Sequence, residues 1–203
     1  MKWFYLLLVF GLPSASPGFQ VVYQIDAKSR MFLNGSTNIN TFQCFCKDQY
    51  QAATLTGTIN ERNRSIQFNK AQLLIKTELI SCKNKLMNKD LHKALKSDEF
   101  PYIKMELLEA VPQQNQPQLV LNNWYTYKAT THLTIAGVTK PVVVTVQVNK
   151  QSPHLYRLIA SKELLMSDFQ VKPRTPFNMI KIDDLIIINF DLQVLVQTRG
   201  SSS

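Results

Sequence analysis

The sequence is short of the residues on which catalytic motifs depend. Its 3 histidines and 6 glycines form no GxSxG elbow, no HExxH pair, no phosphate-cradling loop and no dinucleotide fingerprint. His132 falls on the polar side of an alternating segment, His92 on the wet side of a helical one, and His154 in a turn, so we expect surface positions. The enzyme hypothesis depends on His132, or on the adjacent Asp183 and Asp184, meeting in a pocket. We expect a protein that is not an enzyme and needs no cofactor.

Cysteine is scarce as well, with 3 residues in the chain. On a strand, Cys44 and Cys46 would face the same side, so they are poorly placed to bond to each other. In an oxidising compartment either of them could pair with Cys82, and both pairings stay open. Nothing near these cysteines has the spacing of zinc ligands, so we expect no metal site.

Acidic residues are in the minority. The 14 Asp and Glu residues face 23 Lys and Arg residues, which gives a formal net charge of +9. The basic residues are scattered, and no stacking aromatics accompany them at motif spacing, so we expect no nucleic-acid partner. The densest groups, between Lys83 and Lys96, fit the wet side of a half-buried helix. Such a surface suits anionic membrane surfaces or acidic headgroups.

Long hydrophobic runs are absent beyond the N-terminus. Residues 1–18, "MKWFYLLLVFGLPSASPG", combine Lys2, an apolar run and small residues, which is the layout of a secretory signal peptide cut after Gly18. The run is too short to span a bilayer, and no later run of about 18 apolar residues occurs, so we expect no transmembrane segment. The predicted protein is periplasmic or secreted, with one domain over 19–197 and a disordered tail over 198–203.

The dominant pattern that is present has a period of two residues. In 185–197, "LIIINFDLQVLVQ", the even positions are apolar and most odd positions are polar, which predicts a long half-buried strand. The same alternation occurs in 125–135 and in 142–148. Short turns such as 60–63 and 149–154 separate such segments, which indicates an antiparallel sheet. A sheet of this size disposes of its edges most completely by closing into a barrel.

One segment has a helical period instead. In 87–101, Met87, Leu91, Ala94 and Leu95 share one face. Asn88 is the expected cap of the first turn, and the helix is expected to stop between Ser97 and Pro101. The predicted fold is therefore an all-β antiparallel barrel of about eight strands, with one short α-helix at an end of it.

The connection "AGVTK" (136–140) joins two of the predicted strands. Gly137 supplies the backbone freedom that a hairpin turn needs, and Pro141 is placed where the next strand is expected to begin. The stretch has no phosphate-binding character, so we interpret it as a turn.

Four stretches, in order along almost the whole mature chain, resemble the YceI-like family of polyisoprenoid- and lipid-binding domain proteins. They are "YQIDAKSRMFLNGSTNINTFQC" (23–44), "MNKDLHKALKSDEFPYIKMEL" (87–107), "THLTIAGVTKPVVVTVQV" (131–148) and "LLMSDFQVKP" (164–173). The Gly-Val-Thr-Lys turn is the most specific single element. The resemblance implies an exported, lipocalin-like barrel whose channel holds a long amphiphile, typically a polyisoprenoid.

The hypothesis is therefore a non-enzymatic protein that holds an isoprenoid or other long-chain lipid in an apolar channel. The candidate lining residues come from the apolar faces of the hairpin and the last strand: Leu133, Ile135, Val144, Val146, Ile188, Phe190, Leu192 and Val194. The alternative is an envelope protein-interaction module with a filled barrel and a basic surface. A homodimer is left open.

Overall fold

The computed structural model describes residues 18–48, 50–114, 118–173 and 180–198. The expected signal peptide, except Gly18, and the expected tail, except Thr198, lie outside these residues. The twelve strands of the described chain are β1 Gly18–Ile25, β2 Arg30–Thr37, β3 Thr41–Cys46, β4 Ala53–Ile59, β5 Ile66–Lys70, β6 Gln72–Lys76, β7 Ile80–Ser81, β8 Tyr102–Pro112, β9 Trp124–Ile135, β10 Val138–Lys150, β11 Leu155–Leu165 and β12 Ile182–Thr198. Helix α1 is Lys85–Ala94, and two 3₁₀ turns are η1 Thr77–Leu79 and η2 Met166–Phe169.

Eight of these strands form a closed antiparallel ring. The order is β1-β4-β5-β8-β9-β10-β11-β12, and β12 pairs back with β1. The ring confirms the predicted barrel and its strand number. It encloses a core in which the even-numbered side chains of β12, such as Phe190, pack with β9 and β10 side chains such as Leu133 and Val144.

Strand β12 is 17 residues long and changes partner along its length. Its C-terminal part pairs with β1, and its N-terminal part, up to Asp191, pairs with β2. The Asp191 carboxylate lies at this change of partner. It accepts bonds from Arg157 at 2.9 and 3.0 Å and from Arg30 at 2.9 Å. Charge-assisted bonds of this kind hold β2, β11 and β12 together on the outer wall.

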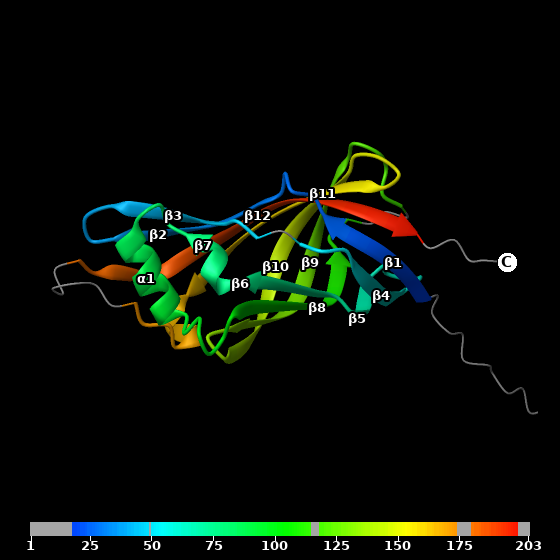
Figure 1. Ribbon diagram of the computed structural model, residues 1–203. Coiled ribbons are helices and arrows are strands. Elements are labelled where there is room, and N and C mark those ends of the chain that lie inside the picture. The colour runs from blue at the N-terminus through cyan, green and yellow to red at the C-terminus, as the bar shows by residue number, and fades with distance from the viewer. Residues whose placement is uncertain (1–17, 49, 115–117, 174–179, 199–203) are drawn as a thin grey trace, which may run out of the picture.

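At the β2 end the barrel wall divides. Strand β2 continues to β3 and β7 on one side, while β6 stays paired with β8 on the other. Helix α1 lies across this end beside β7, opposite the end from which the C-terminus leaves (Figure 1). Strands β10 and β11 are also hydrogen-bonded only from Val146 to Lys150 on the β10 side. The α1 end is thus the open end of the barrel.

The predicted apolar face of helix α1 is confirmed, but the predicted N-cap residue, Asn88, is wrong. Leu95 is buried, and Met87, Leu91 and Ala94 pack against the core. The N-cap is Asn84, whose side chain accepts the backbone N–H groups of Leu86 and Met87. Apolar periodicity could not locate this start, because the first turn belongs to the rim of the barrel.

The predicted hairpin turn is confirmed at residues 136–137. Ala136 and Gly137 have φ of 48° and 82°, as a two-residue type I′ turn requires. A Cβ on Gly137 would lie 2.5 Å from a ring carbon of Phe100. Pro141 does not begin the next strand; it lies within β10, opposite His132. Hydrogen-bonded and non-hydrogen-bonded pairs alternate along the ladder from the hydrogen-bonded pair Ile135–Val138, so the His132–Pro141 pair is a non-hydrogen-bonded one. The N–H group that proline lacks is therefore not needed for a bond to β9.

No helix in the described parts of the chain is long and apolar enough to cross a bilayer.

Candidate functional site

A cavity of ≈ 290 Å³ opens at the α1 end of the barrel. Its wall takes side chains from α1, β2, β3, β7, β8, β9, β12 and η2. Only four of the described lining residues have a polar side chain, and they are Thr37, Asn40, Asn84 and Asp90. The rest of the lining is apolar or belongs to the disulfide, so the cavity suits an apolar chain better than a polar substrate.

The strand side of the cavity follows from the alternation of β12. Ile186 and Ile188 keep the even-numbered face inward, and Leu33 of β2 lies opposite Ile188. A register irregularity between Ile182 and Ile186 bends the strand at its start, as such irregularities do. Ile182 also lines the cavity. The first half of β12 is therefore the long wall of the cavity.

The helix side is built from residues spaced by about one turn. Met87, Leu91 and Leu95 face the cavity at positions i, i+4 and i+8, which share one face of a helix. Leu95 is 5% exposed and forms the deep end of this stripe. Asp90 lies at the margin of the same face and is half-buried. A carboxylate is thus the only charged side chain among the described lining residues.

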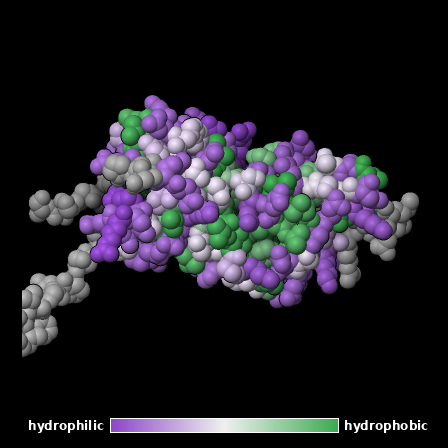
Figure 2. Space-filling view, turned by 180° about the vertical axis from the view of Figure 1, so that it is seen from behind, coloured by the Kyte–Doolittle hydropathy of each residue, from purple (hydrophilic) through white to green (hydrophobic). Residues whose placement is uncertain are grey.

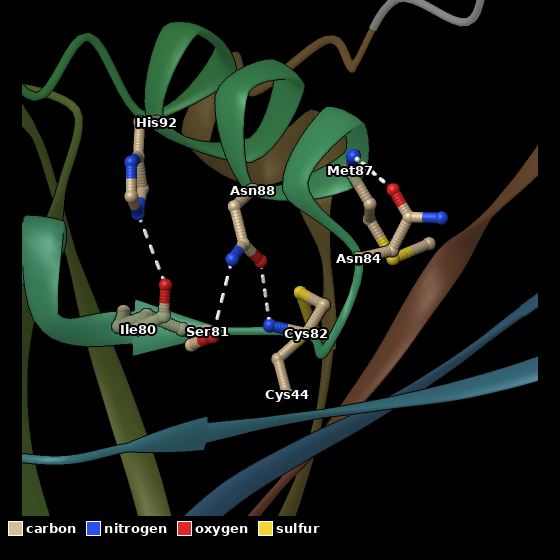
Figure 3. Close-up of a disulfide and its surroundings, with 8 residues drawn as sticks. All are labelled: Cys44, Ile80, Ser81, Cys82, Asn84, Met87, Asn88 and His92. Atoms are coloured by element: carbon tan, nitrogen blue, oxygen red, sulfur yellow. Dashed lines mark hydrogen bonds between the residues drawn. A yellow bond between two sulfur atoms is a disulfide. The ribbon is translucent and has the colours of Figure 1, made fainter.

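A disulfide fixes one wall of the cavity. Cys44 of β3 is joined to Cys82, just before α1 (Figure 3), while Cys46 is free. The sequence left open which cysteine pairs with Cys82. The bond is 1% exposed at Cys44 and 7% at Cys82. It links β3 to the start of the helix and so holds the helix close to the barrel.

Two side chains of α1 also hold the helix on β7. Asn88 accepts the Cys82 backbone N–H at 2.7 Å and donates to Ser81 Oγ at 3.1 Å. His92 donates from Nε2 to the Ile80 carbonyl at 3.0 Å (Figure 3). Both positions correct the sequence analysis. Asn88 is not the helix cap, and His92 is half-buried against β7 rather than on the wet side of the helix.

The free Cys46 contacts a half-buried tyrosine hydroxyl. Its sulfur is 3.5 Å from the Tyr50 hydroxyl, which in turn donates to Met31 Sδ at 3.4 Å. Burial raises the pKa of the Tyr50 hydroxyl. Within the described residues, no group of three or more His, Cys, Asp or Glu side chains could hold a metal ion.

The eight residues predicted to line a channel fall into two groups. Ile135 and Ile188 line the cavity. The other six pack within or against the core: Leu133, Val144, Val146, Phe190, Leu192 and Val194. All eight face inward, as the alternation indicated. Of the eight positions, the cavity reaches the two that lie towards the α1 end, where the wall divides.

The residues of the enzyme hypothesis are not brought together. His132 is exposed on the outer side of β9. Asp183 accepts a bond from Ser36 Oγ at 2.6 Å. Asp184 accepts the Ser167 backbone N–H at 2.7 Å and a bond from the Ser167 hydroxyl. The two carboxylates therefore engage different partners on β2 and η2.

The alternating pattern of the strands does not predict the mouth of the cavity. Ile39, Leu86 and Ile180 line it and are also exposed to solvent, at 67%, 54% and 38%. They come from the β2–β3 turn, the first turn of α1 and the segment before β12. None of the three lies in a strand with an alternating pattern. One sequence feature could have indicated the mouth, which is an apolar residue in an otherwise polar turn, as in "TNINT" (37–41).

This architecture, an elongated antiparallel barrel with an apolar cavity under one helix, is that of a lipocalin-like β-barrel. The chain belongs to the YceI-like domain family, whose model matches residues 23–194. No curated protein sequence matches it. It is similar in structure to a polyisoprenoid binding domain from Saccharophagus degradans implicated in plant cell wall breakdown, with a TM-score of 0.63 and 12% identity over 86% of this chain and 98% of that one. It is also similar to Burkholderia cenocepacia BcnA, with a TM-score of 0.64 and 18% identity over 84% of this chain and 99% of that one. At these identities the structural matches show the fold.

Proposed function

We propose that the cavity at the α1 end binds the chain of an isoprenoid or another long-chain amphiphilic lipid. The observation that carries the proposal is the lining, which is apolar apart from four polar side chains. The Saccharophagus degradans domain of the same fold is described as polyisoprenoid-binding. That description supports a lipid as the class of ligand.

The size of the cavity limits what it can hold in this conformation. A volume of ≈ 290 Å³ equals that of about ten water molecules and is close to the lower end of ligand pockets, about 300 Å³. About ten methylenes buried there contribute about 8 kcal/mol, part of which offsets the entropy lost on association. A longer chain extends either out of the mouth or into the core. The second course requires side chains such as Val146 and Leu192 to move.

We also propose that the protein acts outside the cytoplasm, in the periplasm or as a secreted protein. The N-terminal layout of residues 1–18 and a buried disulfide support this, because disulfides persist in oxidising compartments. The proposed role is sequestration or transport of the lipid without chemical change.

The test is a comparison of two tryptophan variants in binding a fluorescent polyprenyl probe. Met87→Trp puts a larger side chain into the cavity from the helix, and we expect at least about a tenfold loss of affinity, equivalent to about two methylenes. Val143→Trp is the control, because Val143 is 51% exposed and does not line the cavity. Equal affinity of the wild type and both variants would reject the cavity as the binding site.

The alternative, a protein-interaction module with a filled barrel, makes the opposite prediction. In that case the probe does not bind to the wild-type protein, and organic extraction of the purified protein yields no lipid. The apolar cavity under α1 is the observation that favours lipid binding.

A further inference from the structure

The mouth of the cavity has an exposed apolar rim, formed by Ile39, Leu86 and Ile180. Their exposed fractions are 67%, 54% and 38%. Two of the contributing segments are tied together. The Asn38 backbone N–H donates to the Lys181 carbonyl at 3.0 Å, and the Lys181 N–H donates to Asn38 Oδ1 at 2.9 Å. Ile39 and Ile180 are thus held on adjoining segments, and Leu86 projects from the helix that forms another part of the mouth.

Exposed lysines accompany the segments that form the cavity. Five of them are each next in the chain to a lining residue, and they are Lys83, Lys85, Lys89, Lys172 and Lys181. Lys85 and Lys181 directly adjoin Leu86 and Ile180 of the rim. Four carboxylates lie on the same segments, and they are Asp90, Asp168, Asp183 and Asp184. Asp168 pairs with Lys140 at 3.9 Å, and Asp183 and Asp184 accept hydrogen bonds from the hydroxyl groups of Ser36 and Ser167. The five lysines exceed these four carboxylates, and the whole chain carries +9, so the rim combines apolar contacts with positive charge.

We propose that this rim docks on the surface of an anionic lipid bilayer, with the mouth of the cavity toward the lipid. Exposed apolar side chains flanked by lysines match the two regions of such a surface, since the apolar groups enter the acyl boundary and the lysines stay among the headgroups. Docking in this orientation lets an insoluble chain pass between bilayer and cavity without crossing water. The docking itself does not depend on what the cavity binds.

The charge argues against a second copy of the chain as the occupant of the rim. A two-fold dimer through this surface brings the same residues of both copies together. It would bring two surfaces of the same sign, each carrying Lys85 and Lys181, against one another, which is unfavourable. An anionic bilayer turns the same charges into attraction, worth about fivefold in affinity for each lysine near the surface.

The test measures binding of the disulfide-intact protein to two kinds of vesicle. One is phosphatidylcholine alone, and the other is phosphatidylcholine with an equal part of phosphatidylglycerol. We expect the protein to sediment with the anionic vesicles at least about tenfold more strongly than with the neutral ones. The binding should weaken as the salt concentration rises. Equal sedimentation with both vesicles, or with neither, would overturn the proposal.

The apolar part of the rim is tested with Ile39→Gln combined with Leu86→Gln. We expect this pair to reduce vesicle binding at least about tenfold, because each buried side chain of this size is worth about that factor. The matched control is Leu74→Gln combined with Val143→Gln, at positions 42% and 51% exposed away from the rim. It should bind like the wild type. Figure 2 shows hydrophobic residues across the middle of the face opposite to that of Figure 1, so this control asks whether any exposed apolar surface suffices.

The basic part is tested with Lys85→Gln combined with Lys181→Gln, against a control of equal charge change. The control is Lys70→Gln combined with Lys128→Gln, at exposed positions on β5 and β9. The rim pair should lose about tenfold or more in binding to anionic vesicles, and the control pair much less. Equal losses would show attraction by net charge only and would overturn the assignment to the rim.

A measurement of molecular mass in solution tests whether a second copy of the chain covers the rim instead of lipid. A monomer, or a dimer that survives the Ile39 and Leu86 substitutions, agrees with docking on lipid. A wild-type dimer that those substitutions dissociate would reassign the rim to an interface between copies. Lipid extraction from the wild-type protein separates the two proposals, because a wild type that carries bound lipid but does not bind anionic vesicles rejects this inference alone.

Discussion

Removing the charge of Asp191 should destabilise the barrel where β12 changes partner from β2 to β1. Its carboxylate accepts bonds from Arg157 at 2.9 and 3.0 Å and from Arg30 at 2.9 Å, and its side chain is 17% exposed. The Arg157 guanidinium, aided by that of Arg30 and opposed by desolvation, lowers the pKa of Asp191 from 3.8 to about 2. Asp191→Asn keeps the shape of the side chain and removes the charge.

The expected magnitude follows from that pKa. A shift of 3.8 to about 2 corresponds to at most about 2.4 kcal/mol. The side chains of Arg157 and Arg30 are 35% and 67% exposed, so solvent screening reduces the value. We expect Asp191→Asn to lower the free energy of unfolding by about 1–2 kcal/mol at neutral pH. Urea denaturation monitored by circular dichroism measures it.

The contribution of the Asp191 carboxylate to stability should depend on pH in a definite direction. Because the pKa of Asp191 is lower in the folded protein than in the unfolded chain, its contribution is fully present above about pH 4 and is lost as the pH falls through about 2. The difference between wild type and Asp191→Asn should therefore shrink over that interval. Asp98→Asn, at an exposed residue after the helix, is the control and should leave stability unchanged. A variant as stable as the wild type at neutral pH, or a difference that does not shrink in acid, would refute this reasoning.

Three further changes test the attachment of α1 and the hairpin. Replacing both Cys44 and Cys82 by serine removes a disulfide between residues 38 positions apart. From the chain-entropy model we expect the free energy of unfolding to fall by about 4 kcal/mol, which urea denaturation measures. Cys46→Ser is the control and should leave stability unchanged. Asn88→Ala leaves the Cys82 N–H without its acceptor and should cost about 1–3 kcal/mol; thermal unfolding unchanged by the substitution would contradict the role given to this side chain. Gly137→Ala places a Cβ at a positive φ and 2.5 Å from an aromatic carbon; a loss of about 1–3 kcal/mol is expected, and a melting temperature equal to that of the wild type would speak against strain at this turn.

The strands could be predicted because apolar and polar residues alternate along each of them, with every second side chain facing the interior. In β12 the alternation from Ile186 to Val194 correctly gave the inward face. The turn at Gly137 was predictable from its own backbone requirement. The change of partner at Asp191 was not predictable, because it depends on residues of β1 and β2 that are more than 140 positions away in the chain. The ionic group around Asp191 became visible only once β2, β11 and β12 lay side by side.

The position of the cavity could not be predicted from the sequence, for a related reason. Alternation tells which side chains face inward but not whether the space between them is filled. Val144 and Ile188 have the same pattern, yet Val144 packs in the core and Ile188 lines the cavity. What decides between them is where the wall divides and where α1 is fixed by Asn88 and the disulfide. These are contacts between distant segments, which no local pattern reports.

The most direct test of the central claim is native mass spectrometry of the protein purified from the culture fluid or periplasm of its own host. The expected mass is above that of the disulfide-bonded chain, with an excess that organic solvent releases as a long-chain amphiphile. Met87→Trp should lower the occupied fraction, and Val143→Trp should not. Wild-type protein found only at the mass of the bare chain, with no lipid in the organic extract and no uptake of a polyprenyl probe, would contradict the account.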